Sequence, residues 1–119
     1  MNPRPIAPAE TELVRWLLAR AGLRTAVDAL ATQVAGLLVA GRCDCGCPSV
    51  EFLVEGLSAT ASIVAEAEGQ TPDGTSVGVL LWARAGRLSG LEVYDRGDSV
   101  NGALPRPEDL YPSTAIGGG

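Results

Sequence analysis

Three cysteines within five residues, Cys43, Cys45 and Cys47, form the most chemically suggestive pattern in this sequence. Thiolates are soft ligands that bind zinc and other thiophilic metals. On a regular strand, alternate side chains lie roughly 6.5–7 Å apart, whereas sulfur atoms bound to one zinc ion lie nearer about 4 Å from one another. Chelation therefore requires the chain to bend, and Gly46 favours a bend because glycine adopts positive φ values.

The cysteine cluster supports three interpretations. The C-x-C spacing is tighter than that of the usual zinc knuckle, and no histidine or second cysteine pair completes a tetrahedron. A fourth ligand would come from Asp44, Glu51, water or another subunit. Arg42 favours thiolate formation and Asp44 opposes it. The cysteines are thus small buried thiols in a turn, a zinc or iron site (possible also across a homodimer), or a redox pair formed by Cys43–Cys45 or Cys45–Cys47.

The sequence contains no histidine, and its nine basic residues are all arginine. This composition excludes Ser-His-Asp and Cys-His nucleophiles, His-ligated catalytic zinc, Schiff-base chemistry and the P-loop lysine. Acid–base work would fall to carboxylates, tyrosine or cysteine. Glu66 and Glu68 share a strand face, and Asp95 and Asp98 flank a turn, but such solvated pairs serve solubility far more often than catalysis. A non-enzymatic role is therefore favoured, with no catalytic residues assigned.

Two arginines, Arg84 and Arg87, flank a predicted hairpin turn at Ala85-Gly86. Together they could grip an anion, although two arginines at a turn are usually simply exposed. In the strand that follows, Gly90 indicates a β-bulge, with Leu88 and Leu91 packing inward.

Composition and charge limit the partners of the chain. The net charge is −5 over 119 residues, and no dense basic cluster is present. Binding to nucleic acid is therefore disfavoured, whereas a basic protein partner suits the acidic surface. No export signal is visible and no apolar stretch is long enough to span a bilayer, so we expect no membrane association and a cytoplasmic location with reduced thiols.

A helix is predicted from Pro8, which suits the first helical position, to a stop at Gly22. Leu13, Trp16 and Leu17 recur on one face of it. A second short helix should begin at Thr25. Aromatic residues are scarce, so Leu, Val, Ala and Ile must build the core, with Trp16 and Trp82 as the largest potential contributors.

Alternating apolar residues and turn signals predict the strands. Five strands are expected, at residues 34–39, 50–54, 61–67, 77–84 and 88–94. The segment 104–112 contains three prolines and should run extended, with one helical turn at 107–110, as a strap over the sheet. The predicted fold class is α+β: one or two N-terminal helices packed on one face of a four- to five-stranded antiparallel meander sheet. A single domain should span residues 1–119, with flexible ends at 1–7 and 113–119.

Two motifs carry a resemblance to known proteins: Cys45-Gly46-Cys47-Pro48-Ser49-Val50, and Gly86-Arg87-Leu88-Ser89-Gly90-Leu91-Glu92-Val93-Tyr94. The chain resembles a group of short actinobacterial proteins that have an N-terminal helix, a Cys-Gly-Cys-Pro-Ser turn, a Gly-Arg-Leu-Ser-like hairpin and a proline-containing tail. The match covers about residues 13–110. The resemblance implies a bacterial source and supplies no activity, because none is assigned to that group.

The function that the sequence favours is a small acidic, non-enzymatic interaction or regulatory module that acts through a protein partner. The alternative is a metal-binding or thiol-redox protein centred on Cys43, Cys45 and Cys47, with zinc as the expected metal.

Overall fold

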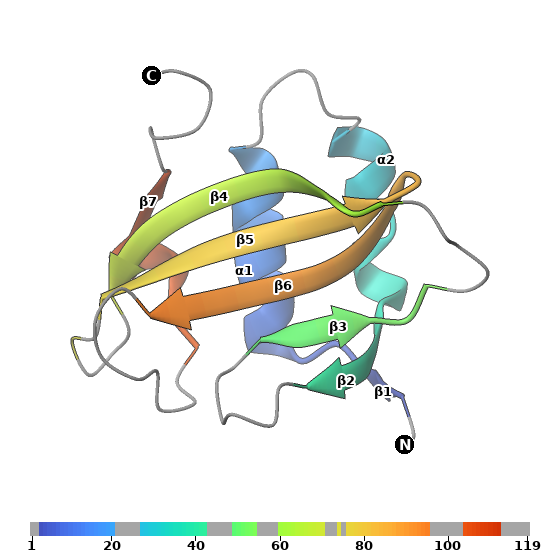
Figure 1. Cartoon of the computed structure of the whole chain (residues 1–119), viewed down its shortest axis with the longest axis horizontal. Helices are drawn as coiled ribbons and strands as arrows, with labels where there is room; N and C mark the ends of the chain where they lie inside the picture. Colours follow the sequence, from blue (N-terminus) through green and yellow to red (C-terminus); the bar gives the residue numbers. More distant parts are fainter. Residues whose placement is uncertain are drawn as a thin grey trace.

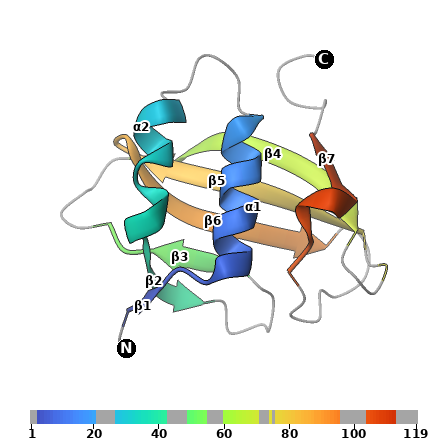
Figure 2. The same ribbon diagram turned by 180° about the vertical axis from the view of Figure 1, so that it is seen from behind.

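The chain folds into a seven-stranded antiparallel sheet with two α-helices on one face, as the computed structural model shows (Figures 1 and 2). The structure describes residues 3–20, 27–42, 49–54, 60–70, 74, 76–95 and 104–112. The α+β class and the packing of the N-terminal helix on the sheet are as predicted. In the part of the chain described, no helix is long and apolar enough to cross a membrane.

The elements in chain order are β1 (Arg4–Pro5), α1 (Pro8–Ala19), α2 (Val27–Ala31), a 3-10 turn η1 (Val34–Gly36), β2 (Leu38–Arg42), β3 (Val50–Phe52), β4 (Ser62–Gln70), β5 (Ser76–Arg84), β6 (Arg87–Asp95), a 3-10 turn η2 (Pro107–Asp109) and β7 (Leu110–Pro112). The strands are ordered β1-β2-β3-β6-β5-β4-β7 across the sheet.

Helix α1 begins at Pro8 as predicted, and a glutamate caps its first turn. The backbone N–H of Ala7 donates to Glu10 Oε1 at 2.9 Å, which satisfies one of the amides that a helix start leaves unpaired. Arg4 of β1 forms two hydrogen bonds to the same carboxylate, at 3.1 and 2.9 Å. The glutamate therefore joins the edge strand to the helix. Leu13 and Leu17 on the inner side of α1 are fully buried against the sheet.

The sheet is a meander only in part. Strands β4, β5 and β6 pair in succession, and a tight turn joins β5 to β6, but β3 pairs with β6 rather than with β4. Val50 of β3 lies opposite Leu91 of β6, and both are buried on the helix side. Strand order of this kind depends on contacts distant in sequence, which local periodicity does not encode.

Two short edge strands raise the strand count above the predicted four or five. Arg4–Pro5 pairs with β2, within the segment 1–7 that we expected to be flexible, and Leu110–Pro112 pairs with β4. Both contain proline, which fits edge strands because it lacks a backbone N–H. The helical turn predicted within 107–110 is present as η2. The strand predicted at 34–39 is wrong in its first half, where residues 34–36 form η1.

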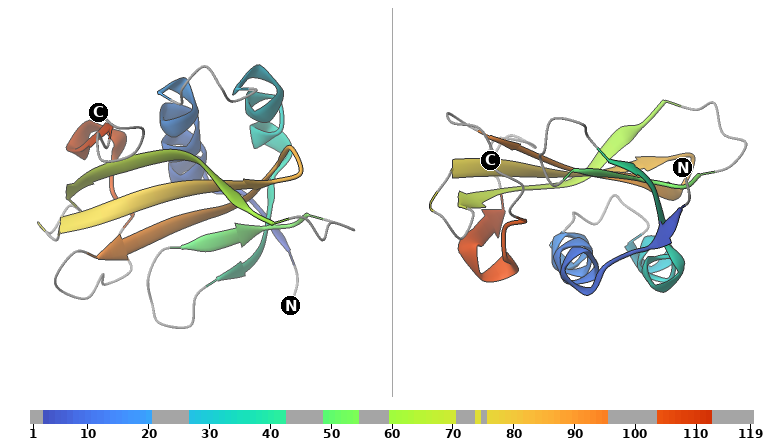
Figure 3. Two further views of the ribbon diagram at one scale, coloured as in Figure 1. Left: turned by 45° about the horizontal axis from the view of Figure 1, so that its top comes forward. Right: turned by 90° about the horizontal axis from the view of Figure 1, so that it is seen from below.

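The core lies between the helices and the sheet (Figure 3). It consists of Leu, Val and Ala side chains together with Phe52. Neither tryptophan belongs to its fully buried part. Trp16 packs at the edge of the core beneath Arg20, whose guanidinium lies 4.2 Å from the centre of the ring. Trp82 lies half-buried on the opposite face of the sheet, which no helix of the described chain covers.

The β5–β6 hairpin is fixed to the helical layer by Gln33, which follows α2. Its amide nitrogen donates to the carbonyl of Gly86 at 2.8 Å, and its amide oxygen accepts from the N–H of Leu88 at 2.9 Å. The turn residues Ala85 and Gly86 both have positive φ, +51° and +81°, as a two-residue type I′ turn requires. The turn of the hairpin is thus held at a defined position beside the helical layer.

Candidate functional site

The three cysteines fall outside the described residues, so the metal and redox hypotheses stay predictions. The structure does describe what flanks the cluster. Arg42, the last residue of β2, pairs antiparallel with Val50 of β3. Elemental analysis of the purified protein, with thiol titration before and after chelator, tests for a metal there.

Ser49 anchors the end of this connection to β6, a role that sequence reasoning missed. Its hydroxyl donates to the carbonyl of Val93 at 3.1 Å and accepts from the N–H of the same residue at 2.8 Å. The side chain therefore continues the β3–β6 ladder where backbone pairing ends. A serine beside a proline carries no sequence signal for such a contact.

The helix-free face of the sheet gathers carboxylates around apolar side chains. Glu66 of β4 lies opposite Leu80 of β5, which lies opposite Glu92 of β6. The three alternate with buried core residues along their strands, so their side chains share the face away from the helices. We call six residues of this face on β4, β5 and β6 the glutamate face: Glu66, Glu68, Leu80, Trp82, Glu92 and Tyr94.

Contacts within the glutamate face leave acceptor capacity open. The indole N–H of Trp82 donates to Glu92 Oε1 at 3.1 Å. Glu66 Oε1 is buried and has no hydrogen-bond partner among the residues that the structure describes. A carboxylate oxygen withdrawn from water without a donor costs free energy, about 1–3 kcal/mol or more, so this position favours an incoming N–H group.

The structure separates the residue pairs singled out in the sequence. Glu66 and Glu68 share one face, as predicted, and Glu92 joins them from another strand. Arg84 and Arg87 lie opposite each other at the hairpin end, but only Arg84 is half-buried. The Asp95 side chain and all of Asp98 lie outside the described part. Among the described residues, no three acidic side chains gather in a way that could hold a metal ion.

Comparison with known proteins adds no assignment to this geometry: no protein-family model, curated protein or solved structure matches the chain.

Proposed function

We propose that this chain is a small acidic, non-enzymatic interaction module whose glutamate face binds a basic segment of a protein partner. The observation that carries the proposal is the row Glu66–Leu80–Glu92, in which two carboxylates flank an apolar side chain on the helix-free face. The two outer Cα atoms lie about 10 Å apart, since the row crosses two strand spacings. A segment that places cationic groups on either side of an apolar one complements this row.

Charge decides the class of occupant. With Glu66, Glu68 and Glu92 on one face, a second copy of the chain would bring like charges together there. A nucleic acid would be repelled for the same reason. A cationic protein segment instead gains from the field of the whole chain, whose net charge is −5, and this field also accelerates association.

Binding of a lysine-rich peptide with interspersed leucines, measured by calorimetry, tests the proposal. The Glu66→Gln/Glu92→Gln double variant should bind this probe about tenfold more weakly, because it removes two surface charge contacts. The matched control is Glu12→Gln/Glu108→Gln, which removes the same charge from exposed positions outside the glutamate face. Equal losses in both double variants would show that net charge alone attracts the peptide and would contradict a docking face.

A further inference from the structure

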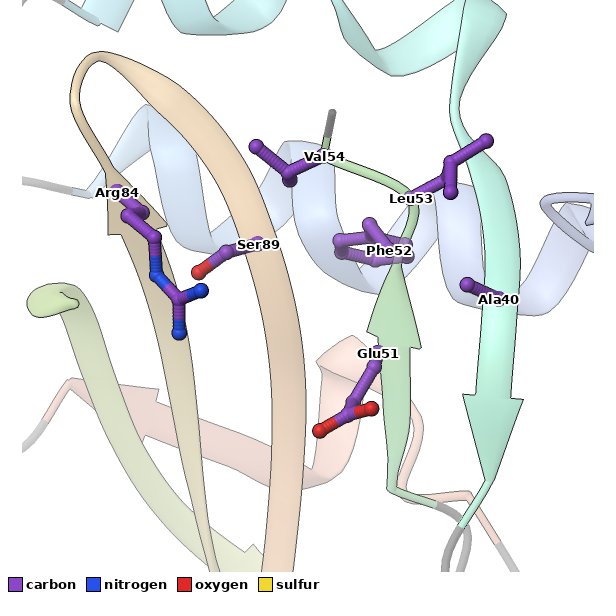
Figure 4. A pocket seen from close by; sticks show the side chains of 7 residues that line it. All are labelled: Ala40, Glu51, Phe52, Leu53, Val54, Arg84 and Ser89. Atoms are coloured by element: carbon purple, nitrogen blue, oxygen red, sulfur yellow. The ribbon is translucent and has the colours of Figure 1, made fainter. Parts of the chain in front are cut away.

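A hollow of about 210 Å³ opens next to the glutamate face, between β3 and the end of the β5–β6 hairpin (Figure 4). It lies on the same helix-free side of the sheet. Six of the residues around it matter for its chemistry: Ala40, Glu51, Leu53, Val54, Arg84 and Ser89.

Two β-bulges shape the hollow. In the β5–β6 pair, Trp82 lies opposite Gly90 and Ala83 opposite Leu88, which leaves Ser89 as the extra residue. In the β2–β3 pair, the register shift leaves Ala40 as the extra residue. Both extra residues line the hollow. Bulges often occur beside functional sites because they redirect a side chain out of the regular ladder.

Arg84 supplies a guanidinium to this hollow. Its Nε is buried and, within the described part of the chain, has no hydrogen-bond partner, whereas Arg87 across the hairpin is exposed to water. Buried N–H groups are nearly always paired in native proteins, so an orphaned one calls for an acceptor. In Figure 4 the Ser89 hydroxyl points toward the Arg84 side chain, and both residues line the hollow. A guanidinium together with a hydroxyl is a donor set that suits a carboxylate.

Glu51 supplies the opposite charge on the other side of the hollow. Its Cα lies opposite Gly90 of β6, which in turn lies opposite Trp82 of β5. Because Gly90 has no side chain, none projects from β6 at that point between Glu51 and β5. The Cα atoms of Glu51 and Arg84 are about 12 Å apart, two strand spacings across and two residues along, and both side chains line the hollow.

The remaining wall is apolar. Leu53 and Val54, which follow β3, line the hollow beside Glu51, and Leu53 is 41% exposed despite its aliphatic side chain. The hollow therefore presents a cation with a hydroxyl, a carboxylate and an aliphatic surface. Its volume is below the roughly 300–1,000 Å³ of sites for drug-sized ligands, so its occupant is a smaller molecule.

We propose that this hollow binds a free α-amino acid with an aliphatic side chain. Arg84 and Ser89 hold the α-carboxylate, Glu51 holds the α-ammonium group, and the side chain contacts Leu53 and Val54. The site does not depend on docking at the glutamate face, because none of these residues belongs to that face.

Titration of the isotope-labelled protein with L-valine, followed by ¹⁵N NMR, tests the site. The Arg84 Nε–Hε signal and the backbone amides of Glu51 and Ser89 should shift and saturate. Two analogues separate the charged groups: isovalerate lacks the ammonium group and isobutylamine lacks the carboxylate. Each should bind at least about tenfold more weakly than valine, since each loses one charge-assisted contact.

Variants assign the contacts. Arg84→Gln should weaken valine binding about 10- to 100-fold, whereas Arg87→Gln, the matched arginine on the other side of the turn, should leave it unchanged. The Glu51→Gln variant should bind valine only as tightly as the wild-type protein binds isovalerate. Glu51 is exposed, so this variant keeps the test valid if Arg84→Gln does not fold. The Glu66→Gln/Glu92→Gln variant should retain full valine binding even if it no longer binds the lysine-rich peptide.

Three results would overturn the proposal. Absence of any saturable shift with valine would show that the hollow does not bind a free amino acid. Equal binding of isovalerate and valine would make the hollow a plain carboxylate site. Unchanged valine binding in Glu51→Gln would show that Glu51 does not bind the α-ammonium group.

Discussion

At the scale of single residues, Gly78 shows how closely the helix-free face is packed. A Cβ atom at this position would overlap the ring of Tyr94, which lies opposite it on β6. We therefore expect Gly78→Ala to lower the free energy of unfolding by about 1–3 kcal/mol, as overpacking does. Denaturant titration measures the change.

Gly90 provides the control for this substitution. A Cβ atom at Gly90 would first meet the backbone oxygen of Val50 at 3.5 Å, an ordinary contact. Gly90→Ala should therefore lower the free energy of unfolding less than Gly78→Ala does. In a Tyr94→Ala background the cost of Gly78→Ala should also shrink, because the clashing ring is gone. Equal costs at both glycines, or no relief without the ring, would contradict the packing described.

The sequence predicted the placement of residues where the alternation within one strand was sufficient. It did not predict placements that depend on how two strands distant in sequence pair. Glu66 and Glu68 were assigned to one face by alternation alone. Leu88 and Leu91 are three residues apart and both face the core, so the bulge that Gly90 indicated is required and is confirmed. That bulge also turns Glu92 to the helix-free face. The pairing of β3 with β6, which brings Glu51 and Arg84 to one hollow, is encoded by no local pattern.

At the scale of elements, the link between β1 and α1 is an ion pair whose arginine keeps its charge into strongly alkaline solution. The hydrogen bond to Glu10 raises the pKa of Arg4 above its ordinary value. A raised pKa of a basic group means that its contribution to stability is complete below the unfolded-state pKa and is lost only as pH rises through the folded-state value. That window lies in strongly alkaline solution.

Arg4→Gln should therefore lower stability by the same amount from neutral pH to about pH 10. The Arg4 side chain is 39% exposed, so water screens the pair and the loss should be about 0.3–1 kcal/mol. Thermal unfolding of Arg4→Gln beside Arg15→Gln, an exposed arginine of α1, measures it. A loss that disappears between neutral pH and pH 10, or an equal loss in Arg15→Gln, would contradict the assignment.

Elements with their own periodicity were predictable and elements defined by a neighbour were not. Helix α1 and strands β4, β5 and β6 follow from spacing of apolar residues, capping and turn residues. β1 and β7 have two and three residues, too few for a period, and each exists only because a longer strand pairs with it. The cysteine cluster, the strongest motif of the sequence, lies outside the described residues, so its chemistry stays a prediction.

At the scale of the whole molecule, the two faces of the sheet have different roles. The helices bury one face of the sheet and leave the other to carboxylates, arginine and aromatic side chains. In the proposed function this asymmetry supports the docking of a basic partner. The negative charge of the chain attracts the partner, and the helix-free face of the sheet provides the surface that the partner contacts. Ionic strength should then weaken binding, since exposed charge contacts are screened within about 10 Å at 0.1 M salt.

The most direct test of this account is NMR shift mapping of the lysine-rich peptide on the wild-type chain. We expect the backbone amides of Glu66, Leu80 and Glu92 to shift together, with the indole N–H of Trp82, while amides of α1 remain unchanged. Shifts confined to these strands would support a docking face. Shifts spread evenly over exposed acidic residues, with Glu12 of α1 as affected as Glu66, would contradict it.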